Sequence, residues 1–594
     1  MRMSKQSRTI VALAMLLFMT ALPGSLFSAQ DSVKAKPGWM EWGERYYPAR
    51  PVRGGYVRVA SPVYIGLMNP HHFPVLDWVT MSNIYERLIL LDAGYRPTVP
   101  WLAVSWEFLD DLTVVMRLRK GVVFHDGTPF NAQAVKYQMD WVMDRDNLAW
   151  TRAWLEPLQS VEVMDEYTLR WHFKKPWGAF LGTMASVPGY VVSPKALERD
   201  AARTKAKKLE RELITLRRKV GQEKDQQKAA SARKAISEKE KQLKSYADLC
   251  RDAGSLDTYP VGTGPFMFES ASTDNYVQLK RNPSWWFGRS VGMPDMPYFD
   301  GVRVSVIPDP SVRLANLKAG KLDFIVLDAV QYRLVKDDPK FRVVTYPINW
   351  LIYLTFNHAR GPCADIRVRK AISHAIDRNA LVQGTQFGLG RVSSCVFPDD
   401  HWAHNPDLKP VTYDPELSKK LLAQAGYAKG LDLTGFTLNI PEAQAFAKAV
   451  MAMLEKVGIH WRPVFLSVTG MMEPFRKLDF DVIGNAYPWI QEPDHIATLL
   501  YDPDSPFNNG RSRNEEAIRL IKSGRETVNE TQRARIYHKL EEALYRNYED
   551  AWLWWPTVVL ASSTNIQGFN ADMFKKYGEG YYFSHPQWFR DGRP

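Results

Sequence analysis

The chain has few of the residues that support redox or hydrolytic chemistry. Its 594 residues include only three cysteines, and no C-x-x-C or H-E-x-x-H motif occurs. The phosphate-binding P-loop, the dinucleotide fingerprint G-x-G-x-x-G and the nucleophile elbow G-x-S-x-G are absent as well. Carboxylates and histidines are plentiful, but they follow no acid/base or triad spacing. We therefore predict that the protein is not an enzyme, with no catalytic residues and no cofactor.

The histidines and cysteines leave two narrower questions. The histidine pairs at 71–72 and 401–404 lie in loops with no cysteine or acidic trio nearby, so we predict no metal site there. In an oxidising compartment, a disulfide between Cys363 and Cys395 would close a loop of about 30 residues. It would add roughly 3–4 kcal/mol to the free energy of unfolding. Free thiols at both positions fit the sequence equally well.

Long apolar runs are also missing after residue 29, where no stretch reaches the roughly 18 apolar residues of a transmembrane helix. The apolar run Ile10–Leu22 follows three basic residues, and Ser28 and Ala29 then offer a cleavage site. This order predicts a secretory signal peptide over residues 1–29, followed by an extended leader over 30–50. No cysteine follows the run for lipid attachment, so we predict export to the periplasm.

Acidic residues are scarce in one segment only. The formal charge is +12, yet residues 195–251 hold 18 Lys and Arg against 9 Asp and Glu, and residues 1–29 add three basic residues and no acidic ones. The rest of the chain is therefore neutral. The basicity belongs to one segment and says little about a ligand.

This basic segment, 194–250, has a helical pattern. Apolar residues recur at spacings of three, four and seven in two runs, which are Leu209, Leu213, Leu216 and Val220, then Ile236, Leu243, Tyr246 and Cys250. Gly221 and a polar stretch lie between them. We predict two antiparallel helices that form a projecting coiled-coil hairpin. Two roles fit it: a solvated helical pair without a partner, and docking to an acidic partner or an anionic membrane surface.

The remaining sequence contains ordered blocks with clear local patterns. Leu112–Arg119 alternates like a strand, Asn131 is placed to cap a helix, and Asp365–Leu381 fits one helix with a buried face. The blocks LRKGVVFHDGTPFNAQAVKY, YPVGTGPFMFES, LKRNPSWWFG, YFDGVRVSVIPDPSVRLANLKAGKLDF and INWLIYLTFNHARGPCADIRVRKAISHAIDRNALV follow one another. Together they resemble the extracytoplasmic solute-binding proteins of the peptide/nickel type, the family 5 receptors of ABC importers. Relatives of this type bind peptides, nickel complexes, sugars, opines and other solutes.

The resemblance implies an α/β, two-lobed periplasmic-binding-protein type II fold of the large, cluster-C-like form, with the hairpin 194–250 inserted in lobe I. A chain of this length also exceeds a single hydrophobic core. Relatives cross between lobes near Trp350 and Asp550, which places lobe I at 51–345 plus 551–594 and lobe II at 346–550. The implied function is a monomeric receptor that closes on a peptide-like or other small solute and delivers it to a membrane permease. No nucleic-acid partner is expected.

The pocket of such a receptor is a desolvated cavity between the lobes, with aromatic walls and a few polar anchors. By resemblance, the candidate ligand-binding residues are Tyr64, Met68, Trp350, Tyr353, Asn357, Trp402, Tyr487, Trp489, Asp494 and Trp554. Taken singly, each of these side chains fits the core as well as a pocket.

The stretch 481–500, DVIGNAYPWIQEPDHIATLL, is the most informative part of this set. Taken alone, it fits a packed loop between a strand and a helix. In peptide-binding relatives the loop resembles W-x-A-D-Y-x-D/E-P, and its first Asp pairs with the α-amino group of the peptide. Aligned on Glu492-Pro493, Trp489 replaces that Asp, and an indole can stack or donate one hydrogen bond but cannot form a salt bridge. A small alignment gap would bring Glu492 or Asp494 to that position instead.

An alternative from another class is an exported scaffold that retains the fold and works through the basic hairpin 194–250. A pocket filled by the protein's own side chains would favour this alternative. A large empty cavity between the lobes would exclude it.

Overall fold

The computed structural model describes residues 51–568 and 588–590, apart from gaps at 62–66, 73–77, 93, 223–224, 251–253, 274, 349, 468, 488–490 and 506. These residues belong to the chain unit Trp42–Pro594. The predicted signal peptide and leader lie outside the described residues. So do two of the candidate ligand-binding residues, Tyr64 and Trp489.

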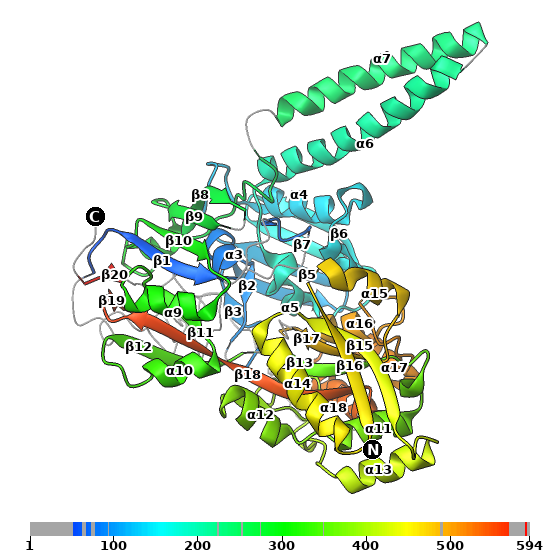
Figure 1. Cartoon of the computed structure of the whole chain (residues 1–594). Helices are drawn as coiled ribbons and strands as arrows, with labels where there is room; N and C mark the ends of the chain where they lie inside the picture. Colours follow the sequence, from blue (N-terminus) through cyan, green and yellow to red (C-terminus); the bar gives the residue numbers. More distant parts are fainter. Residues whose placement is uncertain are drawn as a thin grey trace, which may run out of the picture. The chain divides into compact units, whose positions relative to one another are not determined.

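One large mixed sheet carries most of the strands (Figure 1). They are β1 (Tyr56–Ser61), β8 (Phe266–Ser272), β9 (Tyr276–Arg281), β10 (Gly301–Val306), β11 (Phe324–Leu327), β12 (Phe341–Pro347), β13 (Leu351–Phe356), β14 (Gly390–Val392), β15 (Leu431–Leu438), β16 (Ile459–Leu466), β17 (Val482–Tyr487) and β18 (Asp550–Ser563). The order is β16-β15-β17-β13-β18-β11-β1-β10-β9-β8, and β12 and β14 both pair with β18.

Strand β18 joins the two halves of this sheet. Its residues 550–556 pair with β13 and β14, whereas residues 557–563 pair with β11 and β12. All of these pairings are antiparallel. Most of the strand is buried, as its apolar sequence AWLWWPTVVLAS requires. One continuous strand therefore belongs to both halves.

Smaller sheets flank β1 and its neighbours. Strands β4 (Ala103–Asp110), β5 (Thr113–Leu118), β6 (Leu158–Asp165) and β7 (Thr168–Phe173) pair in the order β4-β5-β7-β6. Two-stranded pairs are formed by β2 (Ile89–Leu90) with β3 (Val99–Pro100) and by β19 (Ile566–Gln567) with β20 (Trp588–Phe589). The strand predicted at 112–119 is β5, so that prediction is confirmed.

Helices cover the sheets. They are α3 (Trp78–Ile84), α4 (Ala132–Met143), α5 (Phe180–Met184), α8 (Trp286–Ser290), α9 (Pro310–Lys318), α10 (Ala329–Val335), α11 (Ile366–His374), α12 (Arg378–Gln386), α13 (Pro415–Gln424), α14 (Pro441–Glu455), α15 (Met472–Lys477), α16 (Pro493–Tyr501), α17 (Glu515–Glu526) and α18 (Glu530–Arg546). Short 3-10 turns are η2 (Arg145–Asn147), η3 (Trp150–Leu155), η4 (Val187–Gly189), η5 (Pro362–Ala364) and η6 (Thr469–Met471).

Two of the helices can be compared with predictions from the sequence. The Asn131 side chain accepts a hydrogen bond from the Ala134 N–H at 3.0 Å, so it caps α4 as predicted. The single helix predicted at 365–381 is wrong, because α11 and α12 are separate. The helix is interrupted before Asp377, which caps the N-terminus of α12. Its carboxylate accepts a hydrogen bond from the Ala380 N–H at 2.9 Å.

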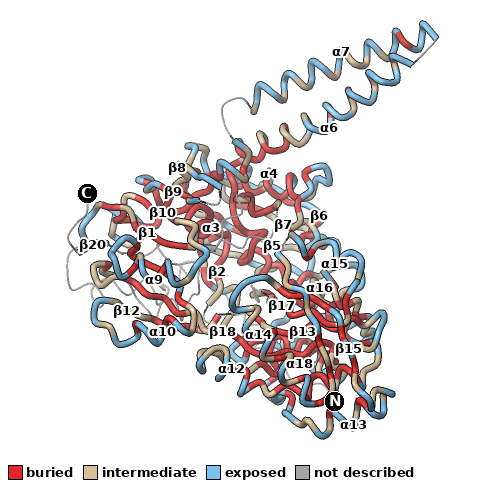
Figure 2. Tube along the Cα trace, in the orientation of Figure 1, coloured by how far each residue is buried: buried red, intermediate tan, exposed pale blue. Residues whose placement is uncertain are grey.

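Two long helices, α6 (Pro194–Gln222) and α7 (Gln226–Leu249), lie side by side in the basic segment (Figure 1). Figure 2 shows that burial in α6 is concentrated near the body of the protein, whereas most of α7 is exposed. Helices were predicted here. Their coiled-coil packing and their status as an insertion into the family fold stay predictions.

The buried residues form separate core clusters, and the two buried cysteines belong to different ones. Cys363 packs with residues of β13, α11 and α14, whereas Cys395 packs with residues of α16 and α18. Both are free thiols in the structure, as is Cys250. The disulfide between Cys363 and Cys395 is therefore not formed, and burial raises the pKa of both thiols above the usual value.

Candidate functional site

The first turn of α16 contacts residues of predicted lobe I through His495. Its ring stacks on the Trp154 indole, with ring centres 4.0 Å apart and planes 5° from parallel. Nε2 of His495 lies 3.0 Å from Thr183 Oγ1, and Nδ1 lies 3.4 Å from Ser186 Oγ. The Thr183 hydroxyl donates to the Ala179 carbonyl, so its oxygen is left to accept the Nε2 proton. The Ser186 hydroxyl likewise donates to the Thr183 carbonyl at 3.0 Å, so these hydrogen bonds do not decide the charge of the ring.

Burial and nearby charges favour the neutral ring. His495 is 4% exposed. Burial first, and then the guanidinium groups of Arg533 and Arg525, hold the pKa of His495 well below its usual value. A proton added to this ring would be desolvated and close to two other cations. The contact between the two predicted lobes is therefore built around an uncharged histidine.

Two buried ion pairs fix the start of α16. Arg533 Nη1 donates to Glu492 Oε2 at 3.3 Å, beside a shorter bond from Nη2 to Oε1. Arg525 Nε lies 3.0 Å from both carboxylate oxygens of Asp494. Glu492 also accepts from the Asp494 N–H at 3.0 Å and thereby caps the helix. Both carboxylates are neutralised within the protein, so neither is a spare anchor for a cationic solute.

Gly178 and Gly182 of predicted lobe I allow their backbone to approach Thr527 and Glu492 of predicted lobe II closely. The Gly178 N–H donates to the Arg525 carbonyl at 2.7 Å. A Cβ at Gly178 would lie 1.8 Å from the Thr527 carbonyl oxygen, and a Cβ at Gly182 would lie 2.0 Å from a carboxylate oxygen of Glu492. Any larger residue at these positions would push the two surfaces apart.

A second contact involves the loop between β2 and β3. Tyr95 stacks on His401, with ring centres 5.2 Å apart and planes 16° from parallel. The neighbouring Arg96 guanidinium lies 5.9 Å from the centre of the Trp402 ring and forms an ion pair with Glu530. Burial lowers the pKa of His401 to about 3, so this histidine is neutral as well.

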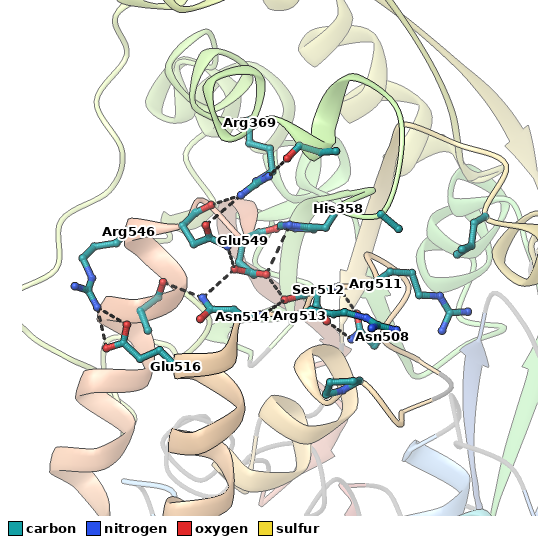
Figure 3. A pocket seen from close by; sticks show the side chains of 16 residues that line it. His358, Arg369, Asn508, Arg511, Ser512, Arg513, Asn514, Glu516, Arg546 and Glu549 are labelled. Carbon is teal, nitrogen blue, oxygen red and sulfur yellow. Dashed lines mark hydrogen bonds and ion pairs between the residues drawn. The ribbon is translucent and has the colours of Figure 1, made fainter. Parts of the chain in front are cut away.

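The described residues also line a cavity of about 900 Å³ beyond the end of β13 (Figure 3). Its polar side chains mostly bind one another. Arg546 pairs with Glu516 at 2.8 Å, and the Glu549 carboxylate accepts from Asn514 at 3.2 Å and from Asn547 at 2.5 Å. A wall of satisfied polar groups is unlike the mostly apolar lining of a solute pocket. We interpret it as a structural cleft.

No group of three His, Cys, Asp or Glu side chains in the described ranges is placed to hold a metal ion. The two histidine pairs have other partners. His71 Nδ1 lies 3.0 Å from Thr151 Oγ1, and His404 Nδ1 lies 3.0 Å from a Glu541 carboxylate oxygen.

Comparison with known proteins places the chain in a family. The profile described as "Bacterial extracellular solute-binding proteins, family 5 Middle" matches residues 97–507. Heme-binding protein A of Haemophilus influenzae is 27% identical over 493 residues, which cover 77% of this chain and 79% of that protein.

The chain is a family 5 solute-binding protein.

Solved structures share the fold of this family 5 protein. The oligopeptide-binding protein AppA of Bacillus subtilis, in complex with a nonapeptide, matches with a TM-score of 0.72 at 21% identity. The match covers 91% of this chain and 100% of AppA. NikZ of Campylobacter jejuni, in complex with Ni(L-His), matches with a TM-score of 0.69 at 21% identity, covering 86% of this chain and 95% of NikZ. At these identities the likeness shows the mixed α/β fold and not the ligand. Within the described ranges, no helix has the length and apolar character needed to cross a membrane.

Some candidate ligand-binding residues of this family 5 protein lie at or near the contact. Trp402 and Asp494 lie within it, and the Arg533 guanidinium is 5.3 Å from the centre of the Trp402 ring. Tyr487, at the end of β17, and Trp350, just before β13, are half-buried. Met68 is buried, and its carbonyl accepts from the Tyr85 hydroxyl at 3.1 Å. A role for these residues in solute binding stays a prediction.

Three further candidates, Tyr353 and Asn357 of predicted lobe II and Trp554 of strand β18, are packed against residues of predicted lobe II. Trp554 packs edge-on against Phe446, with ring centres 5.4 Å apart. Asn357 is fully buried, and its side-chain amide donates to the Phe480 carbonyl at 3.0 Å. Tyr353 borders a cavity of about 10 Å³, which has room for one water. These side chains are occupied by packing in this structure, and a role for them in solute binding stays a prediction.

Sequence reasoning missed the residues that make the closest contact, namely Trp154, Thr183, Ser186, His495 and Arg533. His495 follows Glu492-Pro493-Asp494 directly, so the loop was singled out but its histidine was not. Its partners precede it by more than 300 residues, as the separation of 312 between Thr183 and His495 shows. No local periodicity reports such a pairing.

Proposed function

We propose that the protein is an exported receptor that closes on a small solute between lobe I (51–345 plus 551–594) and lobe II (346–550) and delivers it to an ABC importer. The observation that carries this proposal is the stacked contact of Trp154 and His495 across the two lobes, with Gly178 and Gly182 permitting close approach. Strand β18, which pairs with strands of both lobes, is suited to act as the hinge. Family membership supports delivery to an importer.

The solute would lie beside this contact, where Glu492 and the first turn of α16 meet lobe I. We assign its walls to Tyr64, Met68, Trp350, Trp402, Tyr487 and Trp489. Asp494 contributes indirectly, because its carboxylate holds Arg525 and thereby the start of α16. Aromatic side chains offer broad apolar faces with a polar edge, which suits a partly apolar organic solute.

The charge of the loop restricts the solute class. The two carboxylates near the predicted amine anchor are paired with Arg533 and Arg525. The sequence has Trp489 where peptide-binding relatives have Asp. We infer that the receptor does not depend on a free α-amino group, unlike a standard peptide receptor. Heme, glutathione and dipeptides are named for relatives and therefore define the first compounds to test.

Native mass spectrometry of the protein purified gently from its own compartment tests the proposal, because a co-purifying solute would be released on unfolding. A thermal-shift screen with hemin, glutathione, free peptides and N-acetylated peptides follows. A solute at 100 times its dissociation constant should stabilise the protein by about 2.7 kcal/mol. Stabilisation by free peptides alone, with none by acetylated ones, would contradict the inference about the amino group. No bound solute and no shift with any compound would contradict the receptor function.

We further propose that α6 and α7 form an antiparallel coiled coil inserted into the family fold. Beyond the root of α6, Leu209 and Leu213 of α6 and Ala229 of α7 are the buried residues of the pair, which supports packing along one seam. Deleting 200–248 should leave solute affinity unchanged, because the segment lies outside the proposed pocket.

A further inference from the structure

The root of the α6/α7 pair is held firmly by the body of the protein. Asp200 is buried, and its carboxylate accepts from the Asn69 side-chain amide at 3.1 Å and from the Leu256 N–H at 3.2 Å. Further out, Lys208 forms an ion pair with Asp146 of η2 at 2.9 Å. The pair is thus an anchored element and not a loose tail.

Acidic residues of each helix form ion pairs with basic residues of the other helix. Lys239 of α7 pairs with Glu212 of α6 at 2.5 Å, and Arg217 of α6 pairs with Glu240 of α7 at 2.6 Å. These ion pairs, together with the buried leucines of α6, hold the helices to each other. Each of these pairs uses one acid and one base, so the excess of basic residues in the segment is not neutralised by them.

The outer face of α6 carries a basic stripe, which we define as Lys207, Arg211, Ile214 and Arg218. Their spacing of four, three and four places them on one side of the helix, opposite Leu209 and Leu213. All four are exposed, and Ile214 is 66% exposed. Within the described part of the chain, the three cations of the stripe form no ion pair. The stripe is about 16 Å long.

We propose that the basic stripe docks the receptor on an anionic lipid surface. A straight row of cations with an exposed isoleucine among them matches a flat surface of anionic headgroups, in which the apolar side chain can enter the interface. It offers no concave pocket that would select a folded acidic protein. The inference rests on the proposed function, because a receptor that meets a membrane permease must work beside such a surface.

The charges give the expected size of the effect. Each basic residue near an anionic membrane surface strengthens binding by about fivefold, so the three cations of the stripe together contribute about a hundredfold. The attraction falls off within a Debye length, so binding should weaken strongly between low and physiological salt. Ile214 adds an apolar contribution that salt does not screen.

The test is sedimentation of the full-length protein with vesicles of equal parts phosphatidylglycerol and phosphatidylcholine, compared with pure phosphatidylcholine. The triple variant Lys207→Gln, Arg211→Gln, Arg218→Gln should bind the anionic vesicles about a hundredfold more weakly. The matched control variant Lys318→Gln, Lys429→Gln, Arg476→Gln removes three exposed cations elsewhere and should bind as the native protein does. Ile214→Ser, a change that removes no charge, should weaken binding at every salt concentration.

Equal vesicle binding by the stripe variant and the control, or no binding of the native protein at low salt, overturns the proposal. Stripe-dependent cross-linking to an acidic protein without vesicle binding also overturns it. Circular dichroism establishes that the variants keep their helices, and solute affinity is measured on the same samples. Loss of vesicle binding by the stripe variant, with unchanged solute affinity, supports the proposal. If the native protein bound vesicles but bound no solute, only the proposed receptor function would be contradicted.

Discussion

Acidification should open the receptor through His495. The ring is neutral in the closed contact, where its pKa is held well below the usual value of about 6.5. Separation of the lobes would remove the burial, the largest cause, and raise the pKa toward 6.5, although Arg533 and Arg525 belong to the same predicted lobe and stay near the ring. A group with a depressed pKa in the closed form stabilises closure above the pKa of the open form, and this stabilisation is lost as the pH falls. Each pH unit below the open-form pKa costs about 1.4 kcal/mol, so solute affinity should fall tenfold per unit from this residue alone.

His401 adds a second proton, because it stacks on Tyr95 across the same contact and its pKa is lowered to about 3. Isothermal titration of the co-purified solute between pH 8 and pH 5 should therefore show that solute affinity falls as the pH is lowered, with a slope that corresponds to the uptake of two protons. His495→Gln, which keeps a polar planar side chain, should reduce this to one. His460→Gln is the matched control, because His460 is more exposed and pairs only with Glu455. An affinity independent of pH, or the same slope in His495→Gln, would refute the reasoning.

Three further predictions concern packing and thiols. Gly178→Ala should weaken solute binding by at least tenfold, because its Cβ would meet backbone, whereas Gly384→Ala, with open space around it, should not change affinity in the same titration. Arg533→Met should lower the free energy of urea unfolding by about 3–5 kcal/mol, because it leaves the buried Glu492 charge without its partner. Adding Glu492→Gln should restore part of this loss. If the two substitutions instead gave additive losses, the ion pair would be contradicted. Ellman's reagent should label one thiol, Cys250, in the native protein and three after denaturation, and native labelling of all three would contradict the burial of the others.

The family, the class of fold and several elements could be predicted from the sequence, because they depend on local patterns. The strand β5 and the cap of α4 by Asn131 are examples of signals contained within a few residues. The break between α11 and α12 was missed because the apolar period continues through Asp377, whose carboxylate nevertheless caps the second helix.

The site was harder to predict, because its contacts join residues that are distant in the chain. An aromatic residue such as Trp554 has the same sequence signature in a core as on a pocket wall, and the structure places it in the core. Asp494 illustrates the same difficulty for charges. Its acidic side chain is visible in the sequence, but its pairing with Arg525 is a tertiary fact that removes it from direct contact with a cationic solute.

Strand β18 follows its partner strands in the chain, and this order has a consequence for export. Among the described strands, β12 has β18 as its only partner, and β13 lacks one neighbour without it. A chain that emerges from the translocation pore with its N-terminus first must therefore keep both halves of the sheet unfinished until Asp550–Ser563 has crossed. Unpaired strand edges invite aggregation during this interval. Chaperone protection must then last until β18 has crossed.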